Sequence, residues 1–389
     1  MTKLTTSERL LWARLLCAQS PLGANKMRNL RQWLENNHLS IADFWQDLER
    51  LCPLLHVPAK QQSALRQVRD QWPSPRLAEH LARQQIKIAD INDHDYPALL
   101  RYIPDWPPVL FYQGHLEVLS RLGVAVVGAR ALTAYGQLAI EQLITPQWQD
   151  LVVISGMMTG ADEWAHRRAL SLGIPTAAFL GYGLNNVWPA NLAALKHEIV
   201  ASGGVLVSEF APWSQSRPFH FPLRNRLVAG SSALTLVIEA AVNSGSLITA
   251  RLALDYGRDV LAVPGSIMSE LSRGCLELIK KGALPVASSQ EVLTALSESK
   301  IQLLAGVHAV SLPIASPVVT ATTSQTCPDF GDPWQNQVYA LVLSQKLDTE
   351  GVCTALGAQA PVLTALGFLE LSGEIIRGND GYWRAQLKS

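Results

Sequence analysis

The sequence is poor in the features that mark secreted, zinc-binding and membrane-spanning proteins. Its five cysteines are scattered along 389 residues and no two are spaced as C-x-x-C, so neither a disulfide framework nor a zinc site is predicted. No uninterrupted apolar run reaches the roughly 20 residues that a membrane span requires. Residues 1–20 lack the unbroken apolar stretch and the cleavage site of a signal peptide. We therefore expect a cytoplasmic protein with no metal site and no membrane contact.

The chain also carries no excess charge of either sign. Lys and Arg together number 32, and so do Asp and Glu, which makes the formal net charge at pH 7 zero. This balance excludes a surface coated with positive charge. Phosphate binding, however, depends on a local cluster of cations rather than on their sum. Evidence for nucleic-acid binding must therefore come from basic residues that are clustered in the sequence.

The apolar residues that are present predict a large protein with more than one domain. Hydrophobic residues make up 48% of the chain, and 389 residues exceed the usual length of one domain. Residues 1–82 place apolar side chains at helical spacing in SERLLWARLLCA, MRNLRQWLENN and IADFWQDLERL. Turn-like segments separate these stretches. We expect an N-terminal helical domain with a SAM-like or helical-hairpin organisation.

The pattern of residues 83–296 predicts a central domain with an α/β fold and a parallel sheet. Apolar runs typical of strands recur at 124–127, 151–154, 176–180, 204–207, 234–238 and 260–263. Helical stretches separate most of them, at 135–144, 161–172, 192–201 and 247–256. This alternation favours an extended Rossmann-like core with helices on both faces. Several runs end in Gly, Ser or Glu, where open α/β sheets bind their ligands.

The C-terminal part changes composition twice. Residues 297–332 are rich in Ser, Thr, Pro and Ala with little charge, which predicts a linker. Residues 333–389 contain three helical stretches and then EIIRGNDGYWRAQ, which predicts two strands around a Gly-Asn-Asp-Gly turn. This order is typical of a winged-helix-like domain.

Three glycine-containing loops follow predicted strands and precede predicted helices. In VVGARALTAYG, Gly128 lets backbone amides approach an anion and Arg130 can contact a phosphate, although a tight turn with a solvated arginine explains the same residues. In SGMMTGADEWAH, Gly156 begins a second loop and Asp162 is expected to cap a helix. In NSGSLITA, one serine caps the next helix, and Ser246 is a candidate for anion binding. None of these loops has the G-x-G-x-x-G spacing of a dinucleotide site.

The segment RPFHFPLRNR combines cations and aromatic rings without an acidic residue. Its basic and aromatic members are Arg217, Phe219, His220, Phe221, Arg224 and Arg226. Single-stranded nucleic acid is held by cations on its phosphates and by aromatic faces under its bases. The alternative is that the rings are core and the arginines pair with carboxylates such as Glu209 and Glu239. Four basic and two aromatic residues in one Pro-bounded loop favour nucleic-acid binding.

Other polar residues have simpler explanations. Lys280 and Lys281 end a predicted helix, where cations are stabilised by the helix dipole. Cys275 has no identifiable His or Asn partner and is predicted to be a buried structural cysteine. His166 stands beside two arginines and is predicted to lie on a solvated polar face.

Taken in order, these stretches resemble the DprA/Smf family (DNA processing A). VAVVGAR, SGMMTGADEWAH, SEF, FPLRNRLVAGSS, VIEAAVNSGSLITA, VPG and GCLELIKKGA follow the family's successive motifs across roughly residues 90–290. The sequence departs from the family at Ala129, where Ser is common, and at His220, where Asn is usual. Met158 and Thr159 replace a small residue and an arginine, which would weaken one phosphate contact.

The resemblance implies a function as well as a fold. Members bind single-stranded DNA, dimerise and deliver the RecA recombinase to incoming DNA in natural transformation, without catalysis and without a cofactor. Carried over to this sequence, DNA contact falls on Arg130, Phe221, Arg224 and Arg226. Behind them stand Gly128, Gly156, Arg217, Phe219 and Ser246, with Lys280 or Lys281 extending the basic surface.

Two other functions compete with this interpretation. A nucleotide-binding or nucleoside-phosphate-hydrolysing enzyme on a Rossmann-like fold would need a carboxylate, for which Glu209 and Glu239 are candidates. The P-G-G-x-G-T-x-x-E motif of such enzymes is absent. A transcription regulator would read duplex DNA with residues 360–371, but APVLTALGFLEL has almost no side chain suited to base contacts.

Overall fold

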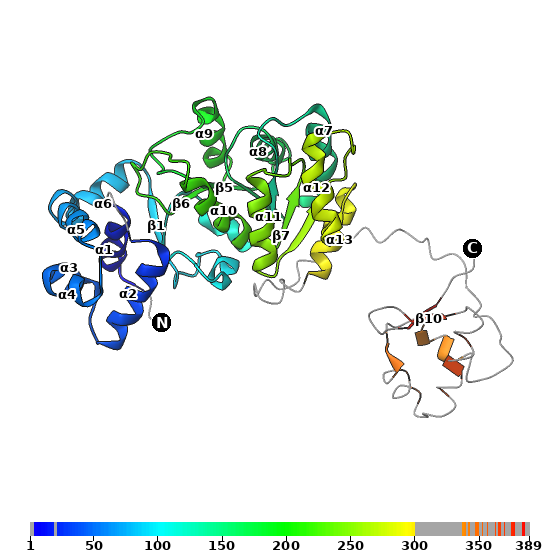
Figure 1. Ribbon diagram of the computed structural model, residues 1–389, viewed down its shortest axis with the longest axis horizontal. Helices are drawn as coiled ribbons and strands as arrows, with labels where there is room; N and C mark the ends of the chain where they lie inside the picture. The colour runs from blue at the N-terminus through cyan, green and yellow to red at the C-terminus, as the bar shows by residue number, and fades with distance from the viewer. Residues whose placement is uncertain are drawn as a thin grey trace. The chain divides into compact units, whose positions relative to one another are not determined.

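The computed structural model describes residues 4–18 and 22–299 and a set of separate residues between 337 and 385. The chain divides into two compact units, Met1–Ile314 and Ala315–Ser389 (Figure 1). The first unit holds both the N-terminal helices and the α/β core. None of the helices that the structure describes is long and apolar enough to cross a membrane.

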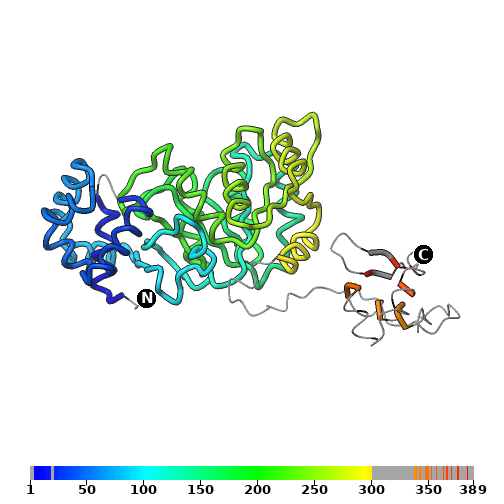
Figure 2. Tube along the Cα trace, turned by 60° about the horizontal axis from the view of Figure 1, so that its bottom comes forward, coloured from blue at the N-terminus to red at the C-terminus, as the bar shows by residue number. Residues whose placement is uncertain are grey.

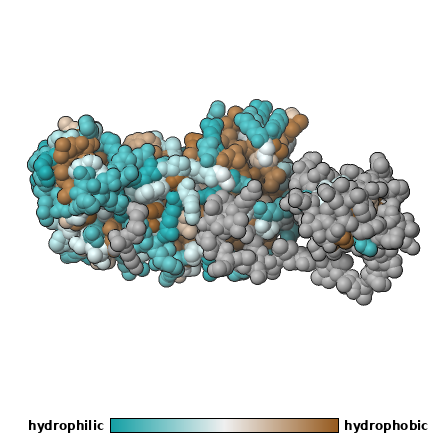
Figure 3. Space-filling model, turned by 90° about the horizontal axis from the view of Figure 1, so that it is seen from below, coloured by the Kyte–Doolittle hydropathy of each residue, from teal (hydrophilic) through white to brown (hydrophobic). Residues whose placement is uncertain are grey.

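The N-terminal region is helical, as its apolar spacing predicts. Its helices are α1 (Thr6–Leu16), α2 (Ala24–Asn36), α3 (Ile41–Gln46), α4 (Leu48–Leu54), α5 (Ala59–Gln71) and α6 (Ser74–Arg83). Thr5 and Glu8 form a capping box that fixes the start of α1, and Ser40 and Asp43 do the same for α3. Hydrophilic residues cover much of the visible surface of this region, with hydrophobic ones between them (Figure 3).

The helical region packs directly on the sheet. Its buried side chains form one hydrophobic cluster with sheet residues that include Val109, Phe111 and Leu180. A buried ion pair joins Arg31 of α2 to Asp90 of the first strand at 2.5 Å. Figure 2 shows the blue N-terminal helices beside the cyan part of the chain that follows them.

The core is a nine-stranded sheet in the order β1-β2-β6-β5-β4-β3-β7-β8-β9. Its strands are β1 (Lys87–Asp90), β2 (Val109–Gly114), β3 (Leu122–Val127), β4 (Leu151–Ser155), β5 (Thr176–Leu180), β6 (Val205–Ser208), β7 (Leu234–Val237), β8 (Asp259–Ala262) and β9 (Leu284–Pro285). From β6 to β9 neighbouring strands are parallel, whereas β2 is antiparallel to both of its neighbours. All six strands predicted for the parallel core are confirmed to within two residues.

Helices cover both faces of the sheet, because successive residues of each strand point to opposite sides. Val124 and Val126 of β3 pack in the cluster that contains α7, α8 and α13, and Ala125 and Val127 pack against α10, α11 and α12. These helices are α7 (Ala134–Leu143), α8 (Ala161–Ser171), α10 (His220–Gly230), α11 (Ser246–Asp255), α12 (Glu270–Lys280) and α13 (Ser289–Glu298). Helix α9 (Ala193–Ala201) and short 3-10 turns at Ala98–Tyr102, Leu116–Ser120, Pro146–Trp148 and Ala190–Leu192 complete the unit.

The strand order places a crevice in the middle of the sheet. From β3 the chain proceeds through β4 and β5 to β6 on one side, and then returns to β7 on the other side of β3. The connections on the two sides of β3 diverge at this point. Open α/β sheets bind ligands here, outside the carboxyl ends of the strands.

The second unit is described only in part. Strands β10 (Ile375–Arg377) and β11 (Trp383–Ala385) pair antiparallel, which confirms the hairpin predicted around Gly-Asn-Asp-Gly. A small cluster with Val338, Leu366 and Ile375 forms its core. The predicted linker from residue 300 onward, and most of the predicted winged-helix pattern, lie outside the described residues.

Candidate nucleic-acid pocket

A pocket of about 480 Å³ opens at the carboxyl edge of the sheet, at the crevice beside β3. Loops after β3, β4, β5 and β7 and the first turns of α10 line it. The lining includes Gly128, Arg130, Gly156, Met158, Thr159, Asp162, Trp188, Pro218, Phe221, Arg224, Asn225, Ser244, Gly245, Ser246 and Thr249. The structure therefore brings together residues that the sequence analysis selected from four separate stretches, namely Gly128, Arg130, Gly156, Phe221, Arg224 and Ser246.

Two glycines hold the β3–α7 and β4–α8 loops in close contact. Gly160 has φ +83°, and a Cβ there would lie 2.3 Å from the carbonyl oxygen of Ala129 and 2.4 Å from that of Arg130. A Cβ on Gly128 would lie 2.7 Å from the Cβ of Ala161. The amide of Ala161 donates to the carbonyl of Ala129 at 3.1 Å. The close approach of the two loops thus requires glycine at both positions, because a Cβ atom at either one would clash.

Arg130 stands over an aromatic face at the mouth of the pocket. Its side chain is exposed, and its guanidinium carbon lies 5.9 Å from the centroid of the Phe221 ring. This distance is within the range of a cation–π contact. No described carboxylate forms an ion pair with Arg130. The pocket therefore presents a free cation and a partly exposed ring side by side.

The sequence analysis predicted that the whole segment RPFHFPLRNR is a loop, but its second half is helical. Helix α10 begins at His220, and Pro222 falls in its first turn, where the missing amide proton has no helical acceptor. The helix turns Arg224 inward, so that only 3% of the residue is exposed. The guanidinium of Arg224 donates to the carbonyl of Gly156 and, at 2.5 Å, to that of Phe179. Arg224 thus forms the floor of the pocket and joins the ends of β4 and β5.

Arg226 is not part of the pocket. It is 5% exposed, and its guanidinium pairs with Glu209 and, at 3.2 Å, with Asp105. This is the carboxylate pairing that the sequence analysis weighed as the alternative. The prediction of Arg226 as a DNA contact therefore loses its geometric basis, because the side chain points into the protein.

Arg217 and Phe219 lie at the rim, on either side of the pocket residue Pro218. Both are exposed, Phe219 by 58%, and neither lines the pocket itself. The ring of Phe219 meets His220 edge-on at 4.6 Å, and His220 stacks on Phe210 at 4.0 Å. These contacts hold the segment before α10 at the edge of the pocket.

The start of α11 forms the wall opposite β4. The hydroxyls of Ser244 and Ser246 lie 2.7 Å apart, and the Ser244 hydroxyl accepts from the amide of Ser246, the first residue of α11, at 3.3 Å. Asn225 of α10 donates to the carbonyl of Gly245 at 3.3 Å and so fixes the loop. The first amides of α11 therefore lie at the pocket, where the positive end of the helix dipole favours an anion.

The chain belongs to a known family. The family model of DNA recombination-mediator protein A matches residues 87–297, more than half of the chain. DNA processing protein DprA of Streptococcus pneumoniae is 42% identical over 216 residues, which are 55% of this chain and 76% of that protein. Protein Smf of Escherichia coli is 42% identical over 202 residues, 51% of this chain and 53% of that protein. These matches confirm the predicted membership of the DprA/Smf family.

The fold agrees with a solved member of this family. The X-ray structure of DprA from Streptococcus pneumoniae is similar with a TM-score of 0.61 and 33% sequence identity. The match covers 75% of this chain and 98% of that one. The predicted extended Rossmann-like core is therefore confirmed for the family and for this chain.

Lys280 and Lys281 lie away from the pocket. They end α12, which starts beyond the carboxyl end of β8 and runs back to the amino end of β9. Both are exposed, but they stand at the opposite edge of the sheet from the pocket loops. They do not line the pocket, and a contact of these lysines with DNA stays a prediction. In the same helix, burial raises the pKa of Cys275 to about 12, in agreement with a structural cysteine.

Buried polar residues of α8 support the pocket from behind. Asp162 accepts from the Met158 amide at 3.3 Å, and burial raises the pKa of this carboxyl against the opposing charge of Arg224. His166 was predicted to face solvent, which is wrong. It is fully buried, it lies 2.7 Å from the hydroxyl of Thr176, and burial lowers its pKa to about 3.

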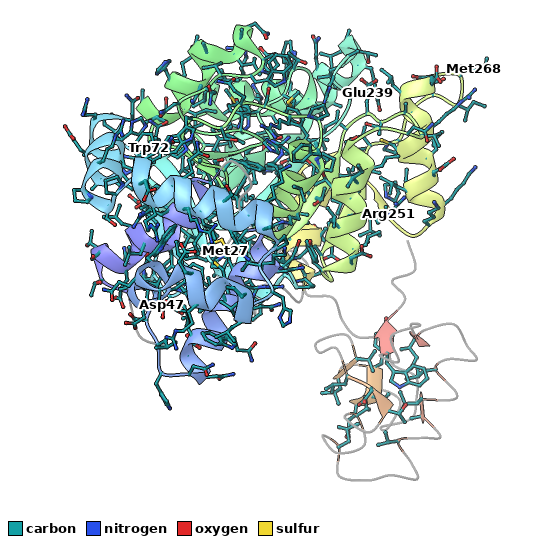
Figure 4. The ribbon with its side chains drawn as sticks, turned by 60° about the vertical axis from the view of Figure 1, so that its left-hand side comes forward. Met27, Asp47, Trp72, Glu239, Arg251 and Met268 are labelled. Carbon is teal, nitrogen blue, oxygen red and sulfur yellow. The ribbon has the colours of Figure 1, made fainter. Side chains whose placement is uncertain are left out.

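Neither carboxylate considered for hydrolysis lines the pocket. Glu239 is 2% exposed and accepts from the Thr133 amide at 2.9 Å and the Thr133 hydroxyl at 2.7 Å, at the start of α7 (Figure 4). Glu209 is mostly buried, with 13% of its side chain exposed, and it pairs with Arg226. The described residues also contain no group of three or more His, Cys, Asp or Glu that could hold a metal.

Sequence reasoning missed Trp188 and Asn225. Trp188 lies in the β5–α9 loop, lines the pocket and is 47% exposed. A large apolar residue in the polar loop LNNVWPAN is a signal that could have revealed it, since exposing such a ring to water is costly. Asn225 was overlooked because its role depends on the approach of α10 to α11, which no local pattern encodes.

Proposed function

We propose that this pocket binds single-stranded DNA. The observation that carries the proposal is the pairing of Arg130, which has no described ion pair, with the face of Phe221 at the pocket mouth. Single strands are held by cations on phosphates and by aromatic rings under bases, and each stacked base contributes about 1–3 kcal/mol. The hydroxyls of Ser244 and Ser246 and the positive end of the α11 dipole supply a second place for a phosphate. Membership of the DNA recombination-mediator family supports the same ligand.

The proposed role is binding without catalysis. A hydrolase would need a carboxylate beside the bound nucleotide, and Glu209 and Glu239 are engaged in the protein interior. Asp162 does line the pocket, but it accepts a hydrogen bond from the backbone of its own loop. Incubation with nucleoside monophosphates should therefore release no free base, and release of base would support the enzyme instead.

The biological role follows from the family. We propose that the chain acts in the cytoplasm as a homodimer, protects incoming single-stranded DNA and helps load the RecA recombinase during natural transformation. Sedimentation equilibrium should report a dimer, and the protein should accelerate RecA filament formation on single strands coated with a single-strand-binding protein.

Binding can be measured by fluorescence anisotropy of labelled oligo-dT and of a duplex of equal length, with salt raised from about 50 to 200 mM. The wild type is compared with Arg130→Ala and with Arg121→Ala. Arg121 is exposed at the amino end of β3 and so tests the loss of an arginine at the opposite edge of the sheet. Arg224→Ala is unsuitable as a first variant, because Arg224 is buried and holds two strand ends.

The expected result is a preference for the single strand and a dissociation constant about tenfold higher in Arg130→Ala. The salt slope should also fall by about 0.7, which corresponds to one lost phosphate contact on a single strand. Arg121→Ala should match the wild type. Equal binding by Arg130→Ala and the wild type would place the DNA on another surface.

A further inference from the structure

A second group of aromatic and basic side chains lies where α6 meets the core. Trp72, which follows α5, stacks on Trp213 of the β6–α10 loop, with ring centroids 4.1 Å apart and planes inclined by 14°. His80 of α6 meets the two rings edge-on at 5.3 and 5.5 Å. Arg76 places its guanidinium carbon 4.9 Å from the Trp72 centroid. We call Trp72, Arg76, His80 and Trp213 the seam cluster.

The seam cluster faces solvent in part and has one free cation. Arg76 is exposed and forms no ion pair with any described residue; one of its amino groups donates to the Gln71 carbonyl at 2.8 Å. Both indoles are only partly buried. The pKa of His80 is lowered by burial and by the nearby charge of Arg83, so its ring is neutral at pH 7 and lies 2.9 Å from the Asn185 amide nitrogen. The available positive charge of the cluster therefore belongs to Arg76.

The seam cluster is continuous with the pocket through two loops. The β5–α9 and β6–α10 loops run together, because the amide of Gly183 donates to the carbonyl of Ser214 and that of Asn185 to the carbonyl of Pro212, both at 2.8 Å. The first loop carries Trp188 into the pocket. The second leads from Trp213 to the rim and to Phe221.

The distance between the two sites is short. Trp213 and Arg217 are four residues apart, so their backbones lie within about 14 Å of each other even in a fully extended chain. Arg217 and Phe219 are exposed along this path. A strand that leaves the pocket past the rim therefore meets cations and rings in succession until it reaches α6.

We propose that the seam cluster is a second contact for the single strand that occupies the pocket. Arg76 binds a phosphate, and the exposed parts of Trp72 and Trp213 pack against the sugar and base next to it. The helical N-terminal region thereby lengthens the DNA site. The proposal rests on the function proposed for the pocket, and it assigns this region a role that the sequence analysis did not foresee.

The test compares a short with a long oligo-dT, of about 6 and about 20 nucleotides, because the single-strand sites of OB-fold proteins, taken as a guide to size, cover about 4–16 nucleotides. The variant is Arg76→Glu in the full chain. The matched control is Arg50→Glu, since Arg50 is also an exposed arginine of the helical region and pairs with Asp47. Figure 4 shows Asp47 and Trp72 at separate places on this region. Urea unfolding of each variant reports whether the fold is intact.

Arg76→Glu should weaken binding of the long strand by about three- to tenfold and lower its salt slope by about 0.7. It should change binding of the short strand by less than about twofold, since the pocket alone accounts for that binding. Arg50→Glu should change neither. Irradiation of the long strand should also crosslink it to Trp72 or Trp213.

Two results would overturn the proposal. If Arg76→Glu and Arg50→Glu bind the long strand equally well, the seam cluster does not touch DNA, and a protein partner or simple packing becomes its role. If Arg76→Glu weakens both lengths equally, the cluster acts only on the pocket. Failure of the wild type to bind either length would instead refute the function proposed for the pocket, and with it this inference.

Discussion

The rim of the pocket and the buried side of α10 carry the same type of side chain in opposite surroundings. Arg130 and Arg217 are exposed and have no described ion pair, whereas Arg224 and Arg226 are 3% and 5% exposed and are bound to carbonyls and carboxylates. All four looked alike as candidates for phosphate contact. The difference indicates that the buried arginines hold the protein interior together, whereas the rim arginines stay available for the ligand that we propose.

The largest effect should come from the buried side. Arg226→Ala leaves the mostly buried carboxylate of Glu209 near Asp105 without its partner, which should lower the free energy of unfolding by about 3 kcal/mol. Urea denaturation measures this loss, with Arg121→Ala as the exposed control. If Arg226→Ala has normal stability but binds DNA poorly, Arg226 is a DNA contact, and the contrast between exposed and buried arginines does not hold.

The free energy of unfolding should also depend on pH through His166, which is buried in α8. The pKa of His166 is about 3 in the folded protein and 6.5 in the unfolded chain, so only the unfolded chain takes up this proton between those values. The free energy of unfolding should therefore fall as the pH drops below 6.5, by about 3 kcal/mol at pH ~4. The raised pKa values of Asp162 and Glu209 act in the opposite direction.

His166→Gln isolates the histidine from these opposing carboxyls. Stability curves of the wild type and the variant, measured by urea denaturation at a series of pH values, should converge as the pH falls. Parallel curves would mean that His166 is accessible to protons in the folded protein.

Phe221 separates stacking from charge at the rim. Phe221→Leu keeps an apolar side chain against Gly181 but removes the ring, so oligo-dT affinity should fall by about 1–3 kcal/mol. The salt slope should stay at the wild-type value, because no phosphate contact is lost. A reduced slope in this variant would mean that Phe221 acts by positioning Arg130 rather than by stacking.

The smallest effect is expected at the amino edge of the sheet. Lys280→Ala and Lys281→Ala remove exposed cations far from the pocket, so single-strand affinity and salt slope should stay within about twofold of the wild type. A loss as large as that of Arg130→Ala would restore these lysines to the DNA site.

The strands and the pocket loops could be predicted because local patterns encode them. Apolar runs bounded by helical stretches gave all six strands of the parallel core, and Gly128 and Gly156 marked the loops at their carboxyl ends. What local patterns do not encode is the direction in which a helical side chain points. His166 lies beside two arginines in sequence, but each residue of a helix is rotated by about 100° from the last, so it alone of the three is fully buried.

Local patterns also could not show that Arg224 and Arg226 of α10 are buried, or that α12 ends away from the pocket. FPLRNR has no clear apolar period, and its burial depends on Glu209, Asp105 and the ends of β4 and β5, which come from distant parts of the chain. Lys280 and Lys281 come after the VPG loop in the sequence. The eleven residues of α12 nevertheless carry them to the other edge of the sheet.

The most direct test of the pocket is to map where the DNA lies. Oligo-dT that contains 5-iodouracil is irradiated in complex with the full chain, and the crosslinked peptides are identified by mass spectrometry. The account predicts crosslinks at Phe221 and Trp188, which Arg130→Ala should weaken. Crosslinks confined to the amino edge of the sheet or to residues 333–389 would contradict it.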